Sequence, residues 1–320
     1  MDWISDQRLS RLRDIVRAPE NEEFRYSILE EIGRGGMATV YRAEDRTLNR
    51  QVALKVLTAA GETADLAERM RREAFILARL EHPGIVPIHD AGTLPDGRLY
   101  YAMKMVNGER LDEYCSRART VPERMRVFLR ICEPVGFAHA SGIIHRDLKP
   151  QNIIVGEFGE VLVLDWGVAK VLRHAEAAAA GSNAISPIET AHGTVIGTAG
   201  YMAPEQSAGQ PNDIDPRSDV YSLGRVLAFL LAGAESETRA SKRLLAIAEK
   251  ASAPGRAERY PDVSSLAADI GRFLDGQPVS AYRESMLERA TAWVARNKTV
   301  TALVLAYVLM RAALIFFLGR

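Results

Sequence analysis

The sequence predicts an α+β protein with two lobes, the first rich in strands and the second helical. Short apolar runs separated by glycines dominate residues 26–106, which is typical of a strand meander. The helical period of apolar residues takes over from 107 to 275. Because strands and helices occupy separate parts of the chain, we expect an α+β arrangement and not alternating βαβ units. A third observation, an apolar stretch at 299–319, predicts one transmembrane helix.

The composition is that of an ordinary globular protein. The 320 residues include 41 basic and 41 acidic side chains, so the formal net charge is zero. This balance argues against a whole-protein nucleic-acid binder, and we predict no nucleic-acid partner. The two cysteines, Cys115 and Cys132, form no Cys-x-x-Cys motif. A disulfide framework and a thiolate metal site are therefore not expected.

The first lobe is predicted to begin after an N-terminal helical extension. Residues 1–25 are polar and charged, with a weak helical pattern of apolar side chains. Three strands are expected from Tyr26 onward, in the runs YSILEEIGRGG, ATVYRAE and QVALKVL. A charged amphipathic helix is predicted over 63–80, and two more strands flank the turn Pro95-Asp96-Gly97.

The second lobe is predicted to be helical, and a further helix follows it. Helical segments are expected at 109–115, 121–141, 218–233, 241–251 and 262–274. Residues 276–298 carry an apolar stripe with basic neighbours. This stripe indicates either a simple helical spacer or a juxtamembrane helix at the membrane surface, with Trp293 as its interfacial anchor.

The C-terminal stretch 299–319 contains 21 residues and a single charge, Arg311. At about 1.5 Å per residue it would extend roughly 32 Å, enough to cross a hydrocarbon core of about 30 Å. The alternative is a buried core helix. Four basic residues precede the stretch within 283–298 and one follows it, so the positive-inside rule places 1–298 in the cytoplasm. We therefore expect a single-pass protein of the cell membrane, inner or plasma, with a cytoplasmic folded domain.

A glycine-rich loop, Ile32-Gly33-Arg34-Gly35-Gly36-Met37-Ala38-Thr39-Val40, lies between two predicted strands. Glycines allow the backbone to approach phosphates and to offer amide hydrogens to them. The same pattern also occurs in ordinary hairpins, so phosphate binding is one of two interpretations. The strand that follows the loop argues against a Walker A loop or a dinucleotide fingerprint, which both need a helix there.

A lysine, Lys55, ends the apolar strand Val52-Ala53-Leu54-Lys55. A lone strand lysine is usually a solvated edge charge. Here the next predicted helix supplies Glu73, which can pair with Lys55. A lysine held by a carboxylate is a fixed positive charge for phosphate oxygens, and this is the second interpretation.

The strongest signal is a set of motifs in a fixed order. They are His145-Arg146-Asp147-Leu148-Lys149-Pro150-Gln151-Asn152, Asp165-Trp166-Gly167, Gly197-Thr198-Ala199-Gly200-Tyr201-Met202-Ala203-Pro204-Glu205 and Ser218-Asp219-Val220-Tyr221-Ser222. With the glycine-rich loop and Lys55, this set resembles the protein-kinase signature over about 26–275. The chain most closely resembles the eukaryotic-like Ser/Thr protein kinases of bacteria, many of which carry a single membrane span.

The resemblance implies a two-lobed protein-kinase fold over 26–275, with an N-lobe at 26–106 and a C-lobe at 107–275. It implies transfer of the ATP γ-phosphate to serine or threonine hydroxyls of protein substrates, with Mg²⁺, or alternatively Mn²⁺, as the metal. Asn152 and Asp165 would be the metal ligands, since both are hard oxygen donors. The nucleotide would be held by Ile32, Gly33, Gly35, Gly36, Val40, Ala53, Lys55, Met103 and Met105.

Catalytic roles also follow from the resemblance. Asp147 would accept the proton of the substrate hydroxyl and orient it, and Lys149 would contact the γ-phosphate. Lys55, paired with Glu73, would hold the α- and β-phosphates.

Several other side chains are expected to support the site. His145 is expected to be a packing residue, and Asp219 is expected to hold the backbone of the catalytic loop. Glu205 is expected to form a structural ion pair with Arg259. Thr190 and Thr194 are the candidate autophosphorylation sites, because a phosphate there would recruit Arg146 and order the loop.

The sequence departs from the family pattern at four places. Ala38 replaces the third loop glycine, and Trp166 replaces the usual phenylalanine. The segment 165–205 is longer than usual, and 233–259 is shorter. The resemblance also implies a homodimer as a hypothesis. The alternatives are a membrane-tethered pseudokinase scaffold and a transmembrane receptor kinase of which this chain is the cytoplasmic part.

Overall fold

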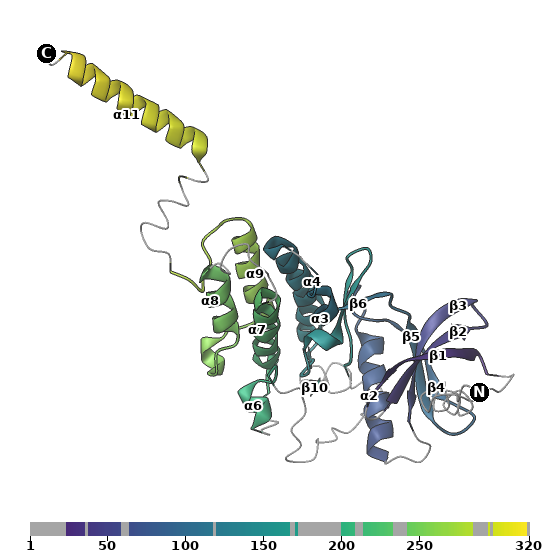
Figure 1. Cartoon of the computed structure of the whole chain (residues 1–320). Helices are drawn as coiled ribbons and strands as arrows, with labels where there is room; N and C mark the ends of the chain where they lie inside the picture. The colour runs from purple at the N-terminus through teal and green to yellow at the C-terminus, as the bar shows by residue number, and fades with distance from the viewer. Residues whose placement is uncertain are drawn as a thin grey trace, which may run out of the picture.

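The computed structural model describes residues 24–35, 38–58, 64–117, 120–166, 170–171, 200–208, 214–232, 242–283, 294 and 297–318. Two lobes follow one another along the chain, the first built on a sheet and the second on helices (Figure 1). The two-lobed α+β arrangement expected from the sequence is confirmed.

The first lobe is a five-stranded antiparallel sheet with one helix. Its strands lie in the order β1-β2-β3-β5-β4, and every neighbouring pair is antiparallel. The elements are β1 (Tyr26–Arg34), β2 (Ala38–Asp45), β3 (Arg50–Leu57), α2 (Ala64–Arg79), β4 (Ile88–Thr93) and β5 (Leu99–Lys104). α2 contacts β4 and β5, so the helix predicted at 63–80 forms and covers the sheet.

The second lobe is mainly helical. Its helices are α3 (Leu111–Tyr114), α4 (Val121–Ala140), η1 (Pro150–Asn152), α6 (Pro204–Ser207), α7 (Pro216–Ala232), α8 (Lys242–Ala251), η3 (Arg256–Glu258) and α9 (Val263–Leu274). Short strands also occur here, namely β6 (Gly108–Arg110), β7 (Ile143–Ile144), β8 (Ile153–Gly156), β9 (Val161–Val163) and β10 (Lys170–Val171). β6, β8 and β9 form a small sheet that the sequence analysis missed, because runs of three or four residues show no clear period.

α4 begins at a well-defined capping box. The backbone N–H of Thr120 donates to Glu123 Oε2 at 2.9 Å, and the N–H of Glu123 donates to Thr120 Oγ1 at 3.4 Å. These bonds satisfy amides that have no partner inside the helix. Pro122 lies in the first turn, where its missing N–H costs nothing. The helix therefore starts where the sequence predicts.

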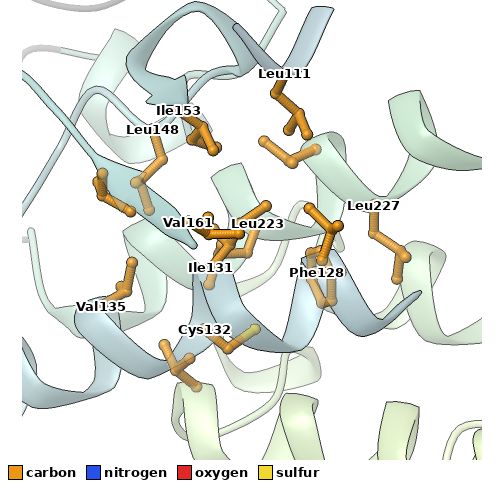
Figure 2. Packing of buried hydrophobic residues seen from close by; sticks show 14 of the residues in the cluster. Leu111, Phe128, Ile131, Cys132, Val135, Leu148, Ile153, Val161, Leu223 and Leu227 are labelled. Atoms are coloured by element: carbon orange, nitrogen blue, oxygen red, sulfur yellow. The ribbon is translucent and has the colours of Figure 1, made fainter. Parts of the chain in front are cut away.

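The core of the second lobe lies between α4 and α7. Figure 2 shows Phe128 and Ile131 of α4 beside Leu227 and Leu223 of α7, with Val135 further along α4, and all five are fully buried. Burying such side chains contributes about 1.5–3 kcal/mol each. This core gives the loop between α4 and β8 a rigid base, and that loop carries the catalytic motif.

The C-terminal stretch forms a helix, α11 (Lys298–Leu318), which lies apart from the two lobes in Figure 1. Among the residues that the structure describes, no helix has the length and apolar character that crossing a membrane requires. The transmembrane helix expected at 299–319 is therefore not supported. The described part of α11 includes Arg311, and a charge at mid-span costs about 2.5–3.5 kcal/mol on insertion scales.

Other predictions fall on residues outside the described part of the chain. Residues 1–23 of the N-terminal extension lie outside it, as do 284–293 and 295–296 of the juxtamembrane segment, with Trp293 among them. The juxtamembrane helix and the cell-membrane location thus stay predictions.

Candidate active site

Lys55 and Glu73 form a buried ion pair between β3 and α2. Lys55 Nζ lies 2.8 Å from each carboxylate oxygen of Glu73, and the Glu73 side chain is 2% exposed. α2 lies against the sheet, which brings a residue 18 positions further along the chain to the end of the strand. The pairing predicted from the sequence is confirmed.

A third charged group, Asp165, lies beside this pair. Its Oδ1 is 3.6 Å from Lys55 Nζ. Burial alone would lower the pKa of the Lys55 ammonium, but Tyr101, Glu73 and Asp165 together raise that pKa above its ordinary value. Lys55 therefore keeps its positive charge at neutral pH, as a phosphate-binding group must.

Asp165 is followed by an aromatic residue that is anchored in the core. Asp165 has φ 61°, in the left-handed region, and its side chain is half exposed. Trp166 is fully buried, its indole N–H donates to the carbonyl of Val163 at 3.2 Å, and its ring lies 4.6 Å from that of His145. The buried indole therefore keeps an aromatic side chain at this position and adds a hydrogen bond that phenylalanine cannot make.

The catalytic motif lies between β7 and β8. Lys149 Nζ lies 2.7 Å from Asp147 Oδ2. The amide nitrogen of Asn152 donates to the Asp147 carbonyl at 2.8 Å and to its Oδ2 at 3.2 Å. The structure thus brings together three of the predicted site residues, with the carboxylate of Asp147 at the centre.

Asp219 of α7 holds the backbone of this motif. The buried carboxylate accepts the backbone N–H groups of His145 and Arg146, each at 2.8 Å. Burial would raise the pKa of Asp219, but hydrogen bonds from His139 and from this backbone lower it below its ordinary value. Arg146 has φ 74°, so the anchor also fixes a strained residue. The structural role expected for Asp219 is confirmed.

His145 is a packing residue, as expected. It is fully buried, and its Nε2 lies 2.9 Å from the carbonyl of Leu164. Glu205 and Arg259 form the predicted ion pair, with distances of 2.7 and 2.9 Å between the guanidinium nitrogens and the carboxylate oxygens. This pair ties α6 to the segment before α9.

Two supporting residues escaped the sequence analysis. His139, at the end of α4, lies 2.8 Å from Asp219 Oδ2 through its Nε2. Gln206 donates to the carbonyl of Arg146 at 2.9 Å and accepts the backbone N–H of Ala203. Neither belongs to a motif run, and only their closeness in sequence to His145 and Glu205 could have drawn attention to them.

The predicted nucleotide-binding residues lie on neighbouring strands of the first sheet. Val40 of β2 is directly opposite Lys55, and Ala53 of β3 is directly opposite Met103 of β5. Gly33 pairs with Val40, and Ile32 is 42% exposed beside it. Met105 follows β5 and is half-buried, and the N–H of Gly35 donates to the carbonyl of Ala38 at 2.9 Å. Register therefore places Gly33, Val40 and Lys55 side by side on three strands, with Ala53 and Met103 two residues further along the sheet.

Some predicted residues cannot be placed. Gly36, Gly167, Thr190 and Thr194 lie outside the described residues, and so does most of the segment between Trp166 and Gly200.

The donor set of Asn152 and Asp165 fits a divalent cation. Asp165 offers a half-exposed carboxylate next to Lys55, and Asn152 uses its amide nitrogen for Asp147, which leaves its carbonyl oxygen as the donor. Mg²⁺ is usually held by one or two protein oxygens together with substrate phosphates. In the described part of the chain no cluster of three metal-ligating side chains occurs, so phosphates and waters would have to complete the shell.

Comparison with known proteins finds a match to one protein family and similarity to many individual proteins. The family description "Protein kinase domain" matches residues 26–276. The serine/threonine-protein kinase PknD of Protochlamydia amoebophila is 33% identical over 84% of this chain, and PknB of Mycobacterium tuberculosis is 36% identical over 83%. The matches cover 32% and 45% of those relatives. The chain thus spans less than half of the length of these relatives.

Solved structures show the same architecture. The crystal structure of the Mycobacterium tuberculosis PknI kinase domain superposes with a TM-score of 0.58 and 25% sequence identity. The superposition covers 78% of this chain and 96% of that domain.

Proposed function

The chain belongs to the protein kinase family, and from that premise we propose that it transfers the ATP γ-phosphate to serine and threonine hydroxyls of proteins. The observation that carries the proposal is the assembled charge cluster of Lys55, Glu73 and Asp165, with 2.8 and 3.6 Å between Lys55 Nζ and the two carboxylates. Phosphoryl transfer needs charge neutralisation and alignment more than covalent chemistry. The Lys55 ammonium, together with a divalent cation held by Asp165, would supply the first requirement.

Asp147 supplies the second requirement. A carboxylate at this position accepts the hydroxyl proton of the substrate and orients its oxygen toward the γ-phosphorus. Lys149, 2.7 Å from Asp147, places a positive charge where the transferred phosphoryl group would pass. The serine/threonine preference rests on Lys149 and on the relatives' names.

A divalent cation would be held by Asp165 and Asn152. When bound, Mg²⁺ neutralises the phosphate oxygens. The chain's own residues do the rest: Lys55 binds the phosphates, Glu73 orients Lys55, and Asp147 accepts the proton of the substrate hydroxyl.

Autophosphorylation is part of the same proposal. Among the described residues no carboxylate forms an ion pair with Arg146, and the positive charge of Arg72 on α2 acts against that of Arg146. Burial, opposed by Asp219 and assisted by Arg72, lowers the pKa of Arg146. A phosphate on the segment between Trp166 and Gly200 would neutralise this pair of cations. Thr190 and Thr194 are the candidates, and transfer between two copies would need a dimer at least transiently.

The test is ATP-dependent labelling of the full chain with Mg²⁺, compared with Asp147→Asn and followed by mass-spectrometric mapping of the sites. Label on serine or threonine that disappears in Asp147→Asn supports the proposal. The pseudokinase scaffold would instead be supported by a folded chain that transfers no phosphate to itself or to generic protein substrates. That chain would have to bind Mg²⁺–nucleotide and to be phosphorylated on this segment already, so that a missing activation step is not the reason. Labelling whose rate per molecule is unchanged on dilution would contradict transfer between copies.

A further inference from the structure

Tyr101 lies beneath the ammonium group of Lys55. The two residues are direct cross-strand partners, Lys55 on β3 and Tyr101 on β5. Lys55 Nζ lies 5.6 Å from the centroid of the Tyr101 ring, and Tyr101 is 2% exposed. Cross-strand partners have Cβ atoms only about 4.5–5.5 Å apart, so strand pairing itself fixes this contact.

The contact is of a kind that holds a cation. An ammonium group within about 6 Å of an aromatic centroid is attracted by the negative face of the ring, and the attraction grows when water is excluded. Water is largely excluded here, because the Lys55 side chain is 14% exposed and that of Glu73 2%. Lys55 thus has a carboxylate on one side and an aromatic ring on another.

We propose that the aromatic ring of Tyr101 is a positioning residue that keeps the Lys55 ammonium directed toward Glu73 and the nucleotide phosphates. The inference rests on the proposed function, and it goes further by assigning a role in that reaction to a residue outside the kinase signature motifs. A lysine has a long flexible chain, and the salt bridge alone fixes only its end. The buried Tyr101 ring occupies the space beside the lysine side chain and so excludes other positions of the ammonium group on that side.

The neighbouring Tyr100 provides a matched control. It belongs to the same strand but lies in a separate cluster, where its ring contacts Phe24 at 5.3 Å and its hydroxyl lies 3.5 Å from Asp90. Because successive strand residues point to opposite faces, a change at Tyr100 disturbs the sheet without touching Lys55.

The experiment uses the full chain with Tyr101→Phe, Tyr101→Leu, Tyr100→Leu and the wild type. It measures kcat and KM for ATP and for a protein substrate, the Kd of a fluorescent ATP analogue, and the thermal midpoint. We expect Tyr101→Leu to lower kcat/KM for ATP about five- to thirtyfold. KM for the protein substrate should stay within about twofold, and so should all parameters of Tyr100→Leu. Tyr101→Phe keeps the ring but loses the hydroxyl that interacts with Lys55 and Glu73, so its loss should be clearly smaller than that of Tyr101→Leu.

A second measurement separates positioning from simple packing. In a Lys55→Met background, Tyr101→Leu should weaken nucleotide binding by less than about twofold, since the group that it positions is gone. The inference would be overturned if Tyr101→Leu weakened nucleotide binding by the same factor in the Lys55→Met background as in the wild type. So would wild-type kinetics in a folded Tyr101→Leu chain, or an equal loss in Tyr101→Phe, which keeps the ring.

The result for the wild type keeps the two proposals apart. A wild-type chain that neither binds ATP nor transfers phosphate would overturn the proposed function together with this inference. A wild type that does both, beside an unaffected Tyr101→Leu, would overturn the inference alone.

Discussion

His139 Nε2 lies 2.8 Å from Asp219 Oδ2, and this contact joins the end of α4 to the start of α7. The same carboxylate accepts the backbone N–H groups of His145 and Arg146. One buried aspartate thus fixes the loop that carries Asp147 to the two helices that form the core of the second lobe. The position of Asp147 is therefore set by packing between α4 and α7.

Asp219→Ala should consequently lose both stability and activity. It would leave the backbone N–H groups of His145 and Arg146 without an acceptor and His139 without its partner, and each unsatisfied buried group costs about 1–3 kcal/mol. We expect a loss of about 3 kcal/mol or more in the free energy of unfolding, measured with urea, and no detectable phosphorylation. The exposed Asp275→Ala is the control and should stay within about 0.5 kcal/mol of the wild type. Near-normal unfolding of Asp219→Ala would contradict the anchoring role.

The Lys55–Glu73 pair allows stability and chemistry to be separated. Lys55→Met leaves Glu73 as a buried carboxylate without its main partner, which should cost about 3 kcal/mol. Adding Glu73→Gln removes the uncompensated charge and should restore most of that loss. Phosphorylation should remain at least about a hundredfold reduced in both variants. Recovery of activity in the double variant, assayed with ATP and a protein substrate, would show that Lys55 is not the phosphate-binding group.

Arg259 is expected to be sensitive to the shape of its side chain as well as to its charge. Its guanidinium makes two hydrogen bonds to Glu205 and further bonds to the carbonyls of Ala253 and Pro254. Lysine cannot reproduce this planar arrangement, so Arg259→Lys should lose about 1–3 kcal/mol, and Arg259→Ala about 3–5 kcal/mol. Thermal unfolding measures both. Equal midpoints for Arg259→Lys and the wild type would contradict the geometric argument.

The pH dependence of stability should report Asp269. This buried carboxylate accepts hydrogen bonds from Tyr260, Arg272 and Ser280. Burial acts to raise its pKa, but these bonds lower the pKa from 3.8 to about 2. Because the folded pKa lies below the unfolded one, the contribution is complete above about pH 4 and disappears as the pH falls toward 2.

Unfolding free energies measured between pH 5 and 3 should therefore fall more steeply for the wild type than for Asp269→Asn. The difference should be on the order of 1 kcal/mol, after allowance for solvent screening. Parallel curves for the two proteins would show that Asp269 is not the responsible group. Asp275→Asn should follow the wild type.

The motifs predicted which side chains of the candidate site contact one another, because each motif is associated with a defined local backbone conformation. Lys55 and Glu73 could be paired from the sequence, since the helix that follows the strand packs back on the sheet and brings Glu73 to Lys55. Tyr101 could not, because its position depends on the β3–β5 register, and β3 and β5 are separated by α2 and β4. His139 could not either, since only the crossing of α4 and α7 brings it to Asp219.

The C-terminal helix shows a different limit of prediction from sequence. Composition alone predicted α11, and the helix forms over the expected residues. Among the described residues no helix has the length and apolar character that crossing a membrane requires, so the transmembrane part of that prediction is not supported.

Removal of the divalent cation should abolish nucleotide binding, and the Mg²⁺ concentration that restores activity should depend on Asp165. With Lys55 Nζ 3.6 Å from its Oδ1, Asp165 keeps one half-exposed carboxylate available for Mg²⁺. Asp165→Asn removes the charge while keeping the shape, so we expect at least a tenfold higher Mg²⁺ concentration for half-maximal phosphorylation. EDTA should release a fluorescent ATP analogue from the wild type, and excess Mg²⁺ should restore its binding. The control, Asp90→Asn, should leave the Mg²⁺ requirement within about twofold of the wild type. An unchanged Mg²⁺ requirement in Asp165→Asn would show that Asp165 is not a metal ligand.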